Sequence, residues 1–354
     1  MKHLIRMALL LSSATAAVAA DPTPAPKYGL VIHGGAGVLV RNEMTPALEA
    51  EYRARLSEAL NTGYAVLDKG GTALDAVTAT INVMEDSPLF NAGKGAVLNA
   101  DGICELDASV MNGRTLAAGA VAGVRHIKNP INLARDVMDK SVHVMLSGDG
   151  AEKFAQTLGY RMMPEEYFQT EFRRRQLEKA QALERSEAGK SASLTTGQPT
   201  FTTADDNYLI NQSKRGTVGC VALDKAGNLA AGTSTGGMTN KKYGRIGDSP
   251  IIGAGTYANN ATCAVSATGW GEFFIRVGVA RDISAQMEYA GKSVAEAAAA
   301  TIAKVGKLGG DGGVIALDAK GNFAMEFNSP GMYRAHKLSG EPEVVAIYGD
   351  ETKR

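Results

Sequence analysis

Residues 216 to 224 read Gly-Thr-Val-Gly-Cys-Val-Ala-Leu-Asp, and this stretch decides how the rest of the chain is interpreted. Here a polar segment gives way to an apolar strand that opens with Thr217. A threonine hydroxyl inside a chain is a poor nucleophile, whereas a threonine at a new N-terminus carries its own base, the free α-amine. The stretch therefore suggests a chain that becomes active when it is cut between Gly216 and Thr217, although a β-branched residue after glycine commonly only begins a strand.

The strand after Thr217 belongs to a pattern that occurs twice. Residues 219–230 read GCVALDKAGNLA, and residues 313–324 read GVIALDAKGNFA. In each copy apolar runs flank Asp-x-x-Gly-Asn, which predicts a β-hairpin whose tip needs glycine at a positive φ. Two helices, over residues 272–289 and 293–305, are predicted between the copies.

The part of the chain before Thr217 mixes strand and helix patterns. Residues 29–33 predict a strand that runs into a glycine turn at 34–37. Apolar residues at three- and four-residue spacing predict helices over residues 45–67, 72–85 and 130–140. Residues 164–190 are charged and predict a further helix at their start, while residues 191–215 are polar and predict a mobile, exposed linker. Strands first and last with helices between them favour two packed sheets covered by helices, an αββα sandwich.

The N-terminus has the layout of a secretory signal peptide. Lys2 and Arg6 precede the apolar run 7–11, and small residues continue to Ala19 and Ala20. No other stretch approaches the roughly 20 apolar residues of a membrane span. We therefore expect a periplasmic or secreted protein without residues 1–20. We expect residues 21–216 to form an α subunit and residues 217–354 a β subunit of one catalytic domain.

Charge and cysteine content limit the partners. The 37 basic and 37 acidic residues balance over the 354-residue chain, so neither nucleic acid nor an anionic membrane is an expected partner. Cys104, Cys220 and Cys263 are an odd number for an exported protein and sit among apolar or small residues. Buried free thiols are favoured over a disulfide framework.

Several motifs occur in one order along the chain. They are HGGAG at 33–37, PLFNAGKGAV at 88–97, ELDASVM at 105–111, TVGCVALD at 217–224, GTSTGGMTN at 232–240, YGRIGDSP at 243–250 and SATGWGE at 266–272. Together they resemble the plant-type asparaginases, also called isoaspartyl peptidases, within the N-terminal nucleophile hydrolases. The resemblance extends from Lys27 to about Tyr348, apart from the polar segment before Thr217.

The resemblance implies a fold and an activity. The fold is the four-layer αββα sandwich. The activity is that of a self-processing threonine amidohydrolase, which cleaves β-aspartyl peptide bonds and the side-chain amide of L-asparagine through a β-aspartyl-enzyme intermediate. It further implies a dimer of αβ heterodimers, and no cofactor for catalysis.

The resemblance also assigns catalytic roles. Thr217 is the nucleophile, and its freed amine, with an ordinary pKa of roughly 7.7 to 8.0, is the general base. The hydroxyl of Thr235 would bind that of the nucleophile. Thr268 and Gly269 would stabilise the oxyanion of the tetrahedral intermediate. No histidine is required.

Arg245 and Asp248 are the implied recognition residues. A guanidinium fork suits the α-carboxylate of an aspartyl group, and a carboxylate suits its α-ammonium. Without the resemblance, the two would be taken for a local ion pair in a loop. Gly271 and Asn91 complete the predicted substrate-binding set. Trp270 stands where the family usually has a small or hydroxyl residue, and we expect its indole to shape the pocket mouth.

A structural sodium ion is also implied. The segment 84–94 resembles the family loop that holds this ion through backbone carbonyls, here those of Met84, Glu85, Ser87, Phe90, Ala92 and Lys94. Carbonyl ligands leave no side-chain pattern in a sequence, and the charge of Lys94 is unusual at its position.

Two other functions remain open at this point. Glycosylasparaginase-like cleavage of sugar–asparagine linkages shares the Arg-x-Gly-Asp-Ser-Pro motif, although the pair Gly236-Gly237 favours the isoaspartyl branch. A non-catalytic periplasmic ligand-binding protein is suggested by GAGTYA at 253–258, which matches G-x-G-x-x-A. No strand–turn–helix pattern surrounds that motif. The preference between asparagine and β-aspartyl dipeptides is not determined by the sequence.

Overall fold

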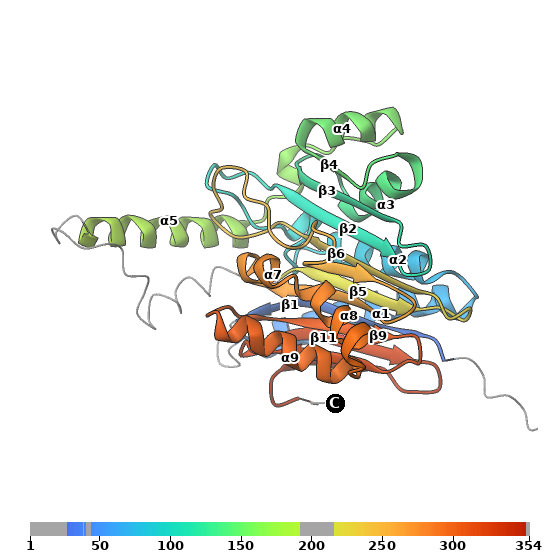
Figure 1. The fold of residues 1–354 in the computed structure, drawn as a ribbon. Coiled ribbons are helices and arrows are strands. Elements are labelled where there is room, and N and C mark those ends of the chain that lie inside the picture. The colour runs from blue at the N-terminus through green and yellow to red at the C-terminus, as the bar shows by residue number, and fades with distance from the viewer. Residues whose placement is uncertain (1–26, 38, 40–43, 192–215, 352–354) are drawn as a thin grey trace, which may run out of the picture.

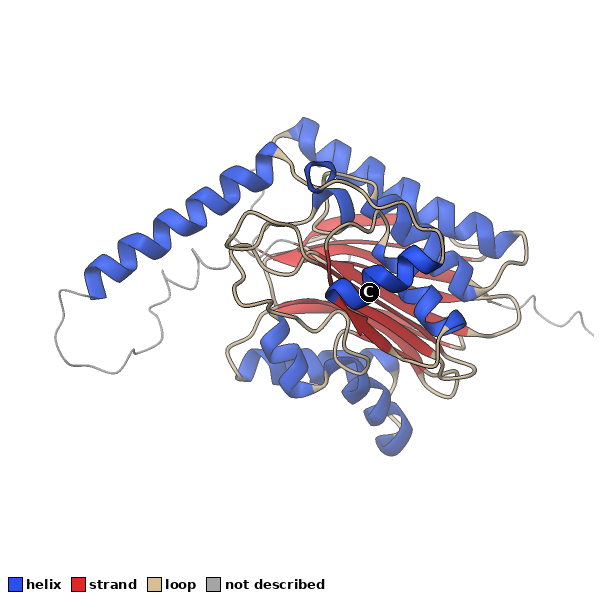
Figure 2. Cartoon of the chain, turned by 90° about the horizontal axis from the view of Figure 1, so that it is seen from above, coloured by secondary structure: helices blue, strands red, loops and turns tan. Residues whose placement is uncertain are grey.

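The chain folds into four layers around two stacked β-sheets. A computed structural model describes residues 27–37, 39, 44–191 and 216–351. The predicted signal peptide and the linker residues 192–215 lie outside this described part. Figures 1 and 2 show strands packed in the middle with helices on both outer sides. The predicted αββα sandwich is therefore confirmed.

The larger sheet has eight strands in the order β12-β11-β1-β5-β6-β2-β3-β4. All neighbours are antiparallel except β3 and β4. Its strands in chain order are β1 (Gly29–Gly37), β2 (Leu106–Asn112), β3 (Ala118–Val124), β4 (Met145–Ser147), β5 (Val218–Leu223), β6 (Leu229–Thr235), β11 (Gly331–Leu338) and β12 (Val344–Tyr348). The strand that follows Thr217 thus lies at the centre of the sheet.

The smaller sheet has four antiparallel strands in the order β10-β9-β8-β7. They are β7 (Thr256–Ala258), β8 (Cys263–Gly269), β9 (Gly312–Asp318) and β10 (Phe323–Phe327). Residues 253–258 lead into β7 and not into a helix, so the nucleotide-binding context for the GAGTYA motif is absent from this described segment.

Helices cover the outer face of each sheet. The larger sheet packs against α1 (Pro46–Asp68), α2 (Ala73–Glu85), α3 (Pro130–Lys140) and α4 (Gly148–Thr157), and the smaller against α7 (Gly271–Val277), α8 (Val279–Ala290) and α9 (Val294–Lys307). Two short 3-10 helices are η2 (Gly93–Gly95) and η3 (Glu165–Tyr167). The helix α5 (Glu171–Ser191) projects from the body of the molecule (Figure 1).

Burial follows the layers. On β5, Cys220 and Ala222 face the helices of the larger sheet, while Val221 and Leu223 face the smaller sheet. Side chains on a strand alternate between faces, so a strand buried on both sides is apolar throughout, as β5 is. A third core lies between the smaller sheet and α7–α9. Cys104, Cys220 and Cys263 are free and buried, as predicted.

Three of the predicted helices begin at side-chain caps. The hydroxyl of Thr45 accepts a hydrogen bond from Leu48 N at 3.2 Å. Thr72 and Ser293 each form a capping box with the acidic residue three positions later. Such side chains satisfy the amide groups that the first helical turn leaves unpaired. These helices match their predicted ranges closely.

Three predictions about local structure were wrong in detail. The strand β1 continues through the glycines to Gly37, because β11 pairs with it over that whole length. The helix predicted over 272–289 is broken at Gly278, whose φ of 64° ends α7 and precedes α8. In the segment 164–190 the helix predicted at the start is only the one-turn η3, and the long helix α5 begins at Glu171.

Within the described ranges, no helix combines the length and apolar character needed to cross a membrane. No group of three or more His, Cys, Asp or Glu side chains in those ranges is arranged to hold a metal ion.

Candidate active site

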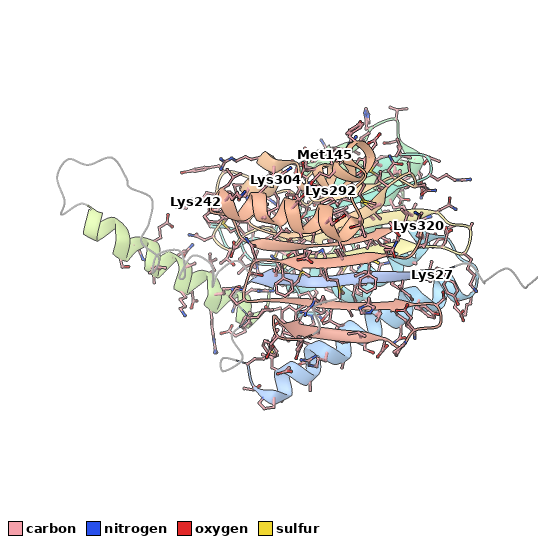
Figure 3. All side chains as sticks on the ribbon, turned by 60° about the horizontal axis from the view of Figure 1, so that its bottom comes forward. Lys27, Met145, Lys242, Lys292, Lys304 and Lys320 are labelled. Atoms are coloured by element: carbon pink, nitrogen blue, oxygen red, sulfur yellow. The ribbon has the colours of Figure 1, made fainter. Side chains whose placement is uncertain are left out.

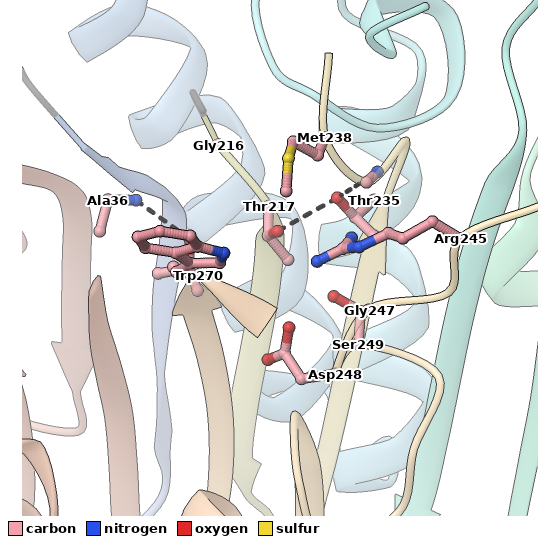
Figure 4. Close-up of a pocket in the computed structure, with 13 residues that line it drawn as sticks. Ala36, Gly216, Thr217, Thr235, Met238, Arg245, Gly247, Asp248, Ser249 and Trp270 are labelled. Carbon is pink, nitrogen blue, oxygen red and sulfur yellow. Dashed lines mark hydrogen bonds between the residues drawn. The ribbon is translucent and has the colours of Figure 1, made fainter. Parts of the chain in front are cut away.

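A pocket opens where the central strands of the two sheets end. It is lined by Ala36, Gly216, Thr217, Thr235, Gly237, Met238, Arg245, Gly247, Asp248, Ser249, Thr268, Gly269 and Trp270 (Figure 4). Of the predicted catalytic and recognition residues, all except Gly271 and Asn91 belong to this lining. Residues as far apart in the chain as Ala36 and Trp270 therefore meet in one cavity.

The hydroxyls of Thr217 and Thr235 face each other at the open end of a hairpin. Strands β5 and β6 pair Val218 with Ser234, so the preceding and following threonines are brought together. Thr217 Oγ1 donates to Thr235 Oγ1 at 3.1 Å, and Thr235 Oγ1 also accepts from Gly237 N at 3.0 Å. The predicted contact between the two threonines is present.

The glycines before Thr217 allow close approach of two backbones. A Cβ on Gly35 would lie 2.2 Å from Gly216 Cα, so a side chain at position 35 would displace the segment that ends in Thr217. Gly216 has a φ of 86°, which favours glycine. In the intact chain Thr217 N is still a peptide nitrogen.

Asn91 lies behind this segment and does not point into the pocket. Its Nδ2 donates to Gly237 O at 2.8 Å, and its Oδ1 accepts from Val97 N at 2.9 Å. A Cβ on Gly216 would lie 3.2 Å from Gly34 O and 3.6 Å from the Cβ of Asn91. Asn91 thus holds the loop after Thr235 in place.

A buried histidine binds the nucleophile's carbonyl group. His33 Nδ1 lies 2.9 Å from Thr217 O, and Nε2 lies 2.9 Å from Ser266 Oγ. Burial lowers the pKa of His33 to about 3, so the ring is neutral. Because a carbonyl only accepts, Nδ1 carries the proton and Nε2 accepts from Ser266.

The hydrogen bonds continue from Ser266 across the space between the sheets. Ser266 Oγ lies 2.6 Å from Thr233 Oγ1, which in turn accepts from Thr256 Oγ1 at 2.6 Å. A Cβ on Gly219 would lie 2.0 Å from Ser266 Oγ and 2.3 Å from His33 Nε2. The glycine two residues after Thr217 therefore makes room for this network, which the sequence analysis did not predict.

Thr268 and Gly269 end β8 beside the nucleophile. The hydroxyl of Thr268 accepts from Ala36 N at 3.1 Å, which ties the smaller sheet to the end of β1. Trp270 N donates to Asp311 O at 2.9 Å, and the indole packs edge-on against Phe273 with ring centroids 4.8 Å apart.

Arg245 is held by an acidic residue that the sequence analysis missed. Its Nε and Nη2 donate to the two carboxylate oxygens of Glu272, each at 2.9 Å. This fork is the one predicted to bind the substrate carboxylate. A Cβ on Gly271 would lie 2.8 Å from both Arg245 Nη2 and Asp248 Oδ1, so Gly271 permits this arrangement from beside the pocket.

Asp248 is a buried carboxyl group next to Arg245. Burial raises the pKa of Asp248 to about 7, against the opposing effect of the Arg245 charge. Its Oδ2 is buried and has no hydrogen-bond partner among the described residues. An unpaired buried carboxylate oxygen in a pocket is an unfavourable arrangement unless a ligand binds it.

In the loop 84–95, two glycines lie against backbone carbonyl groups. A Cβ on Gly93 would lie 2.4 Å from Glu85 O, and one on Gly95 would lie 2.3 Å from Phe90 O. Phe90 O and Ala92 O each accept one backbone hydrogen bond and retain a second lone pair. The ammonium of Lys94 lies 5.7 Å from the centre of the Tyr167 ring. The donor set is compatible with a hard cation that prefers oxygen ligands.

Comparison with known proteins gives the family. The family model described as asparaginase matches residues 26–347. The isoaspartyl peptidase of Salmonella typhimurium is 50% identical over 323 residues, which are 91% of this chain and 99% of that protein. The isoaspartyl peptidase of Escherichia coli is 49% identical over 326 residues, or 92% and 97% of the two chains. The isoaspartyl peptidase/L-asparaginase of Danio rerio is 41% identical over 323 residues, or 91% and 96%. The chain therefore belongs to the plant-type asparaginase family of N-terminal nucleophile hydrolases.

Proposed function

We propose that this protein is a self-processing threonine amidohydrolase that cleaves β-aspartyl peptide bonds and the side-chain amide of L-asparagine. One observation carries the proposal. The 3.1 Å contact between Thr217 and Thr235 lies in the same pocket as Arg245 and Asp248. The positive charge of Arg245 complements the α-carboxylate of an aspartyl group, and the negative charge of Asp248 complements its α-ammonium. The names of the 41–50% identical relatives support the same activity.

The first reaction cuts the chain. The Thr217 hydroxyl attacks the carbonyl carbon of Gly216, and the acyl group moves from nitrogen to oxygen. Water then hydrolyses the ester, which leaves Gly216 with a carboxylate and Thr217 with a free amine. The close approach of Gly35 and the hydrogen bond from His33 to Thr217 O keep both backbones in position for this step.

The second reaction uses the new amine as base. It accepts the proton of Thr217 Oγ1 as that oxygen attacks the β-carbonyl of the substrate, while Thr235 orients the hydroxyl. Thr268 Oγ1 and the amide of Gly269 stabilise the oxyanion, an effect of roughly 2.7 to 4 kcal/mol per donor in other hydrolases. Water hydrolyses the aspartyl ester and regenerates Thr217.

Recognition would depend on Arg245 and Asp248. Glu272 occupies Nε and Nη2 of Arg245, so the substrate carboxylate either binds the remaining Nη1 or displaces Glu272. The unpaired Oδ2 of Asp248 would accept from the substrate ammonium, which would also lower the pKa of that carboxyl group.

The remaining expectations are part of the proposal. The carbonyls of Met84, Glu85, Ser87, Phe90, Ala92 and Lys94 would hold a sodium ion whose charge stabilises the loop in front of Asn91. The protein would be exported after loss of residues 1–20 and would assemble as a dimer of αβ heterodimers.

The test compares substrates with the purified, processed protein. Wild type should release aspartate from a β-aspartyl dipeptide and from L-asparagine, and it should not act on the matching α-aspartyl dipeptide. Thr217→Ala should be inactive on all of them. Preferred cleavage of a sugar–asparagine conjugate, or retained activity in Thr217→Ala, would overturn the proposal.

A further inference from the structure

The pocket has a charged side and an apolar side. In Figure 4, Arg245 lies on one side of Thr217, and Ala36 and Trp270 lie on the other. Arg245 and Asp248 account for the two α-substituents of the aspartyl group, which places the acyl part of a substrate on the charged side. Nothing in the proposed reaction so far uses the apolar side.

The reaction itself locates the leaving group. The amine of Thr217 takes the hydroxyl proton and then delivers it to the departing nitrogen, so that nitrogen must lie beside Thr217 N. In the intact chain the atom bonded to Thr217 N is the carbonyl carbon of Gly216, and Gly216 lines the same pocket as Ala36 and Trp270. Release of Gly216 therefore makes room for the leaving group next to these two residues.

The indole of Trp270 is fixed in place on this side. Its backbone is bound to Asp311 O at the start of α7, and Phe273 supports the ring edge-on at an interplanar angle of 73°. The residue is partly buried and belongs to the lining of the pocket. An indole held in the wall of a pocket is a suitable surface for an apolar or aromatic group.

We propose that Trp270 binds the leaving group and makes the enzyme selective for β-aspartyl peptides whose departing residue has an apolar or aromatic side chain. This inference rests on the proposed function and specifies its substrate class. In the acylation step the amide C–N bond breaks, the Oγ1–C ester bond forms, and the departing amine leaves with the proton from Thr217. Ammonia, the leaving group of L-asparagine, is too small to contact the indole.

The experiment measures kcat/KM for β-aspartyl-phenylalanine, β-aspartyl-glycine and L-asparagine. Trp270→Ala should lower the value for the phenylalanine peptide about tenfold and change the other two less than twofold. Trp270→Phe keeps an aromatic ring and should lower kcat/KM for the phenylalanine peptide only two- to threefold. This variant also tests the proposal if Trp270→Ala is not processed. Tyr289→Ala is the control, since that exposed aromatic residue in the last turn of α8 stacks with Arg281 and does not line the pocket.

The outcomes are separable. Equal losses for all three substrates would show that Trp270 only supports the site, and unchanged values for all three would show that it makes no contact with the leaving group. Either result, or a wild type that treats the phenylalanine and glycine peptides alike, would overturn the inference while leaving the proposed function in place. A processed wild type that hydrolyses none of the three would instead overturn the proposed function.

Discussion

The two hairpins with nearly the same sequence have the same tip structure and differ at their open ends. In β5–β6 and β9–β10 the aspartate at the tip, Asp224 or Asp318, accepts hydrogen bonds from the amides two and four residues later. The tip glycines Gly227 and Gly321 have φ values of 80° and 83°. The local sequence therefore specifies the same turn in both places, as predicted.

The chain continues differently from the open ends of the two hairpins. After β6 the chain runs through residues 236–255, which carry Arg245 and Asp248, whereas after β10 only residues 328–330 separate the hairpin from β11. By alignment of the two copies, Thr217 and Thr235 correspond to Asp311 and Ser329. The comparison teaches that the hairpin is a scaffold, and that its chemistry depends on the residues at the open end and on the loop that follows. Figure 3 shows Lys320, at the second tip, far from Lys242, which precedes Arg245.

The largest effect should come from the paired hydroxyls. Thr235→Val removes the group bound to Thr217 Oγ1, and we expect kcat/KM for a β-aspartyl dipeptide to fall on the order of 100-fold, within the range for groups that assist proton transfer. Ser329→Ala, the equivalent change in the second hairpin, should stay within twofold of wild type. Similar losses in both variants would contradict the distinction between the hairpins.

The loop after the first hairpin provides the second prediction. Arg245→Ala should still be processed, because the internal scissile bond has no free carboxylate. Its kcat/KM for β-aspartyl dipeptides should fall roughly 30-fold or more, from the loss of about 2 kcal/mol or more when a buried charge is left unpaired. Glu272→Gln, which weakens the hold on the guanidinium, should have a smaller effect.

A substrate analogue without the α-carboxylate is the control for that prediction. Wild type should discriminate against the analogue, and Arg245→Ala should discriminate far less. A processed Arg245→Ala protein that keeps the full wild-type preference would show that the residue forms only a structural ion pair with Glu272.

The third prediction concerns stability and pH. The pKa of Asp248 is about 7 in the folded protein, above its ordinary value, so the folded state retains a proton that the unfolded chain releases near pH 4. This group therefore makes the free energy of unfolding decrease as the pH rises from about 4 to about 7. Asp248→Asn should be more stable than wild type at pH 8, by a few kcal/mol, and similar to it at pH 4. Denaturant unfolding of the two ligand-free proteins at pH 4 and pH 8 measures this difference in stability. A difference between variant and wild type that is the same at both pH values would exclude the proposed titration.

The smallest effect on activity should come from the tips. Asp224→Ala and Asp318→Ala should each destabilise the protein by about 1 to 3 kcal/mol through unpaired amides. The first should be the more severe, because Asp224 Oδ2 also accepts from Ala73 N at the start of α2. Once folded and processed, both variants should have kcat/KM within twofold of wild type. A large loss of activity in either folded variant would mean that the tip aspartates contribute to catalysis and not only to the stability of the turn.

The sequence predicted features that depend on neighbouring residues. The hairpin tips and the ranges of the amphipathic helices follow from local spacing, and the contact between Thr217 and Thr235 was implied by the family resemblance. It could not show that β1 extends to Gly37, since that depends on pairing with β11, some 300 residues later. His33 and Glu272 were missed for the same reason. Their roles arise from contacts with Thr217 and Arg245 across the fold, and neither has a spacing that indicates them.

The central claim is that Thr217 cuts the chain before itself and so becomes the active N-terminal residue. Intact-mass spectrometry of purified wild type and Thr217→Ala tests it directly. Wild type should yield a fragment beginning at Thr217, with the 138 residues 217–354, and a partner ending at Gly216. The variant should remain one chain. The same two fragments from Thr217→Ala would show that another protease makes the cut and would contradict the account.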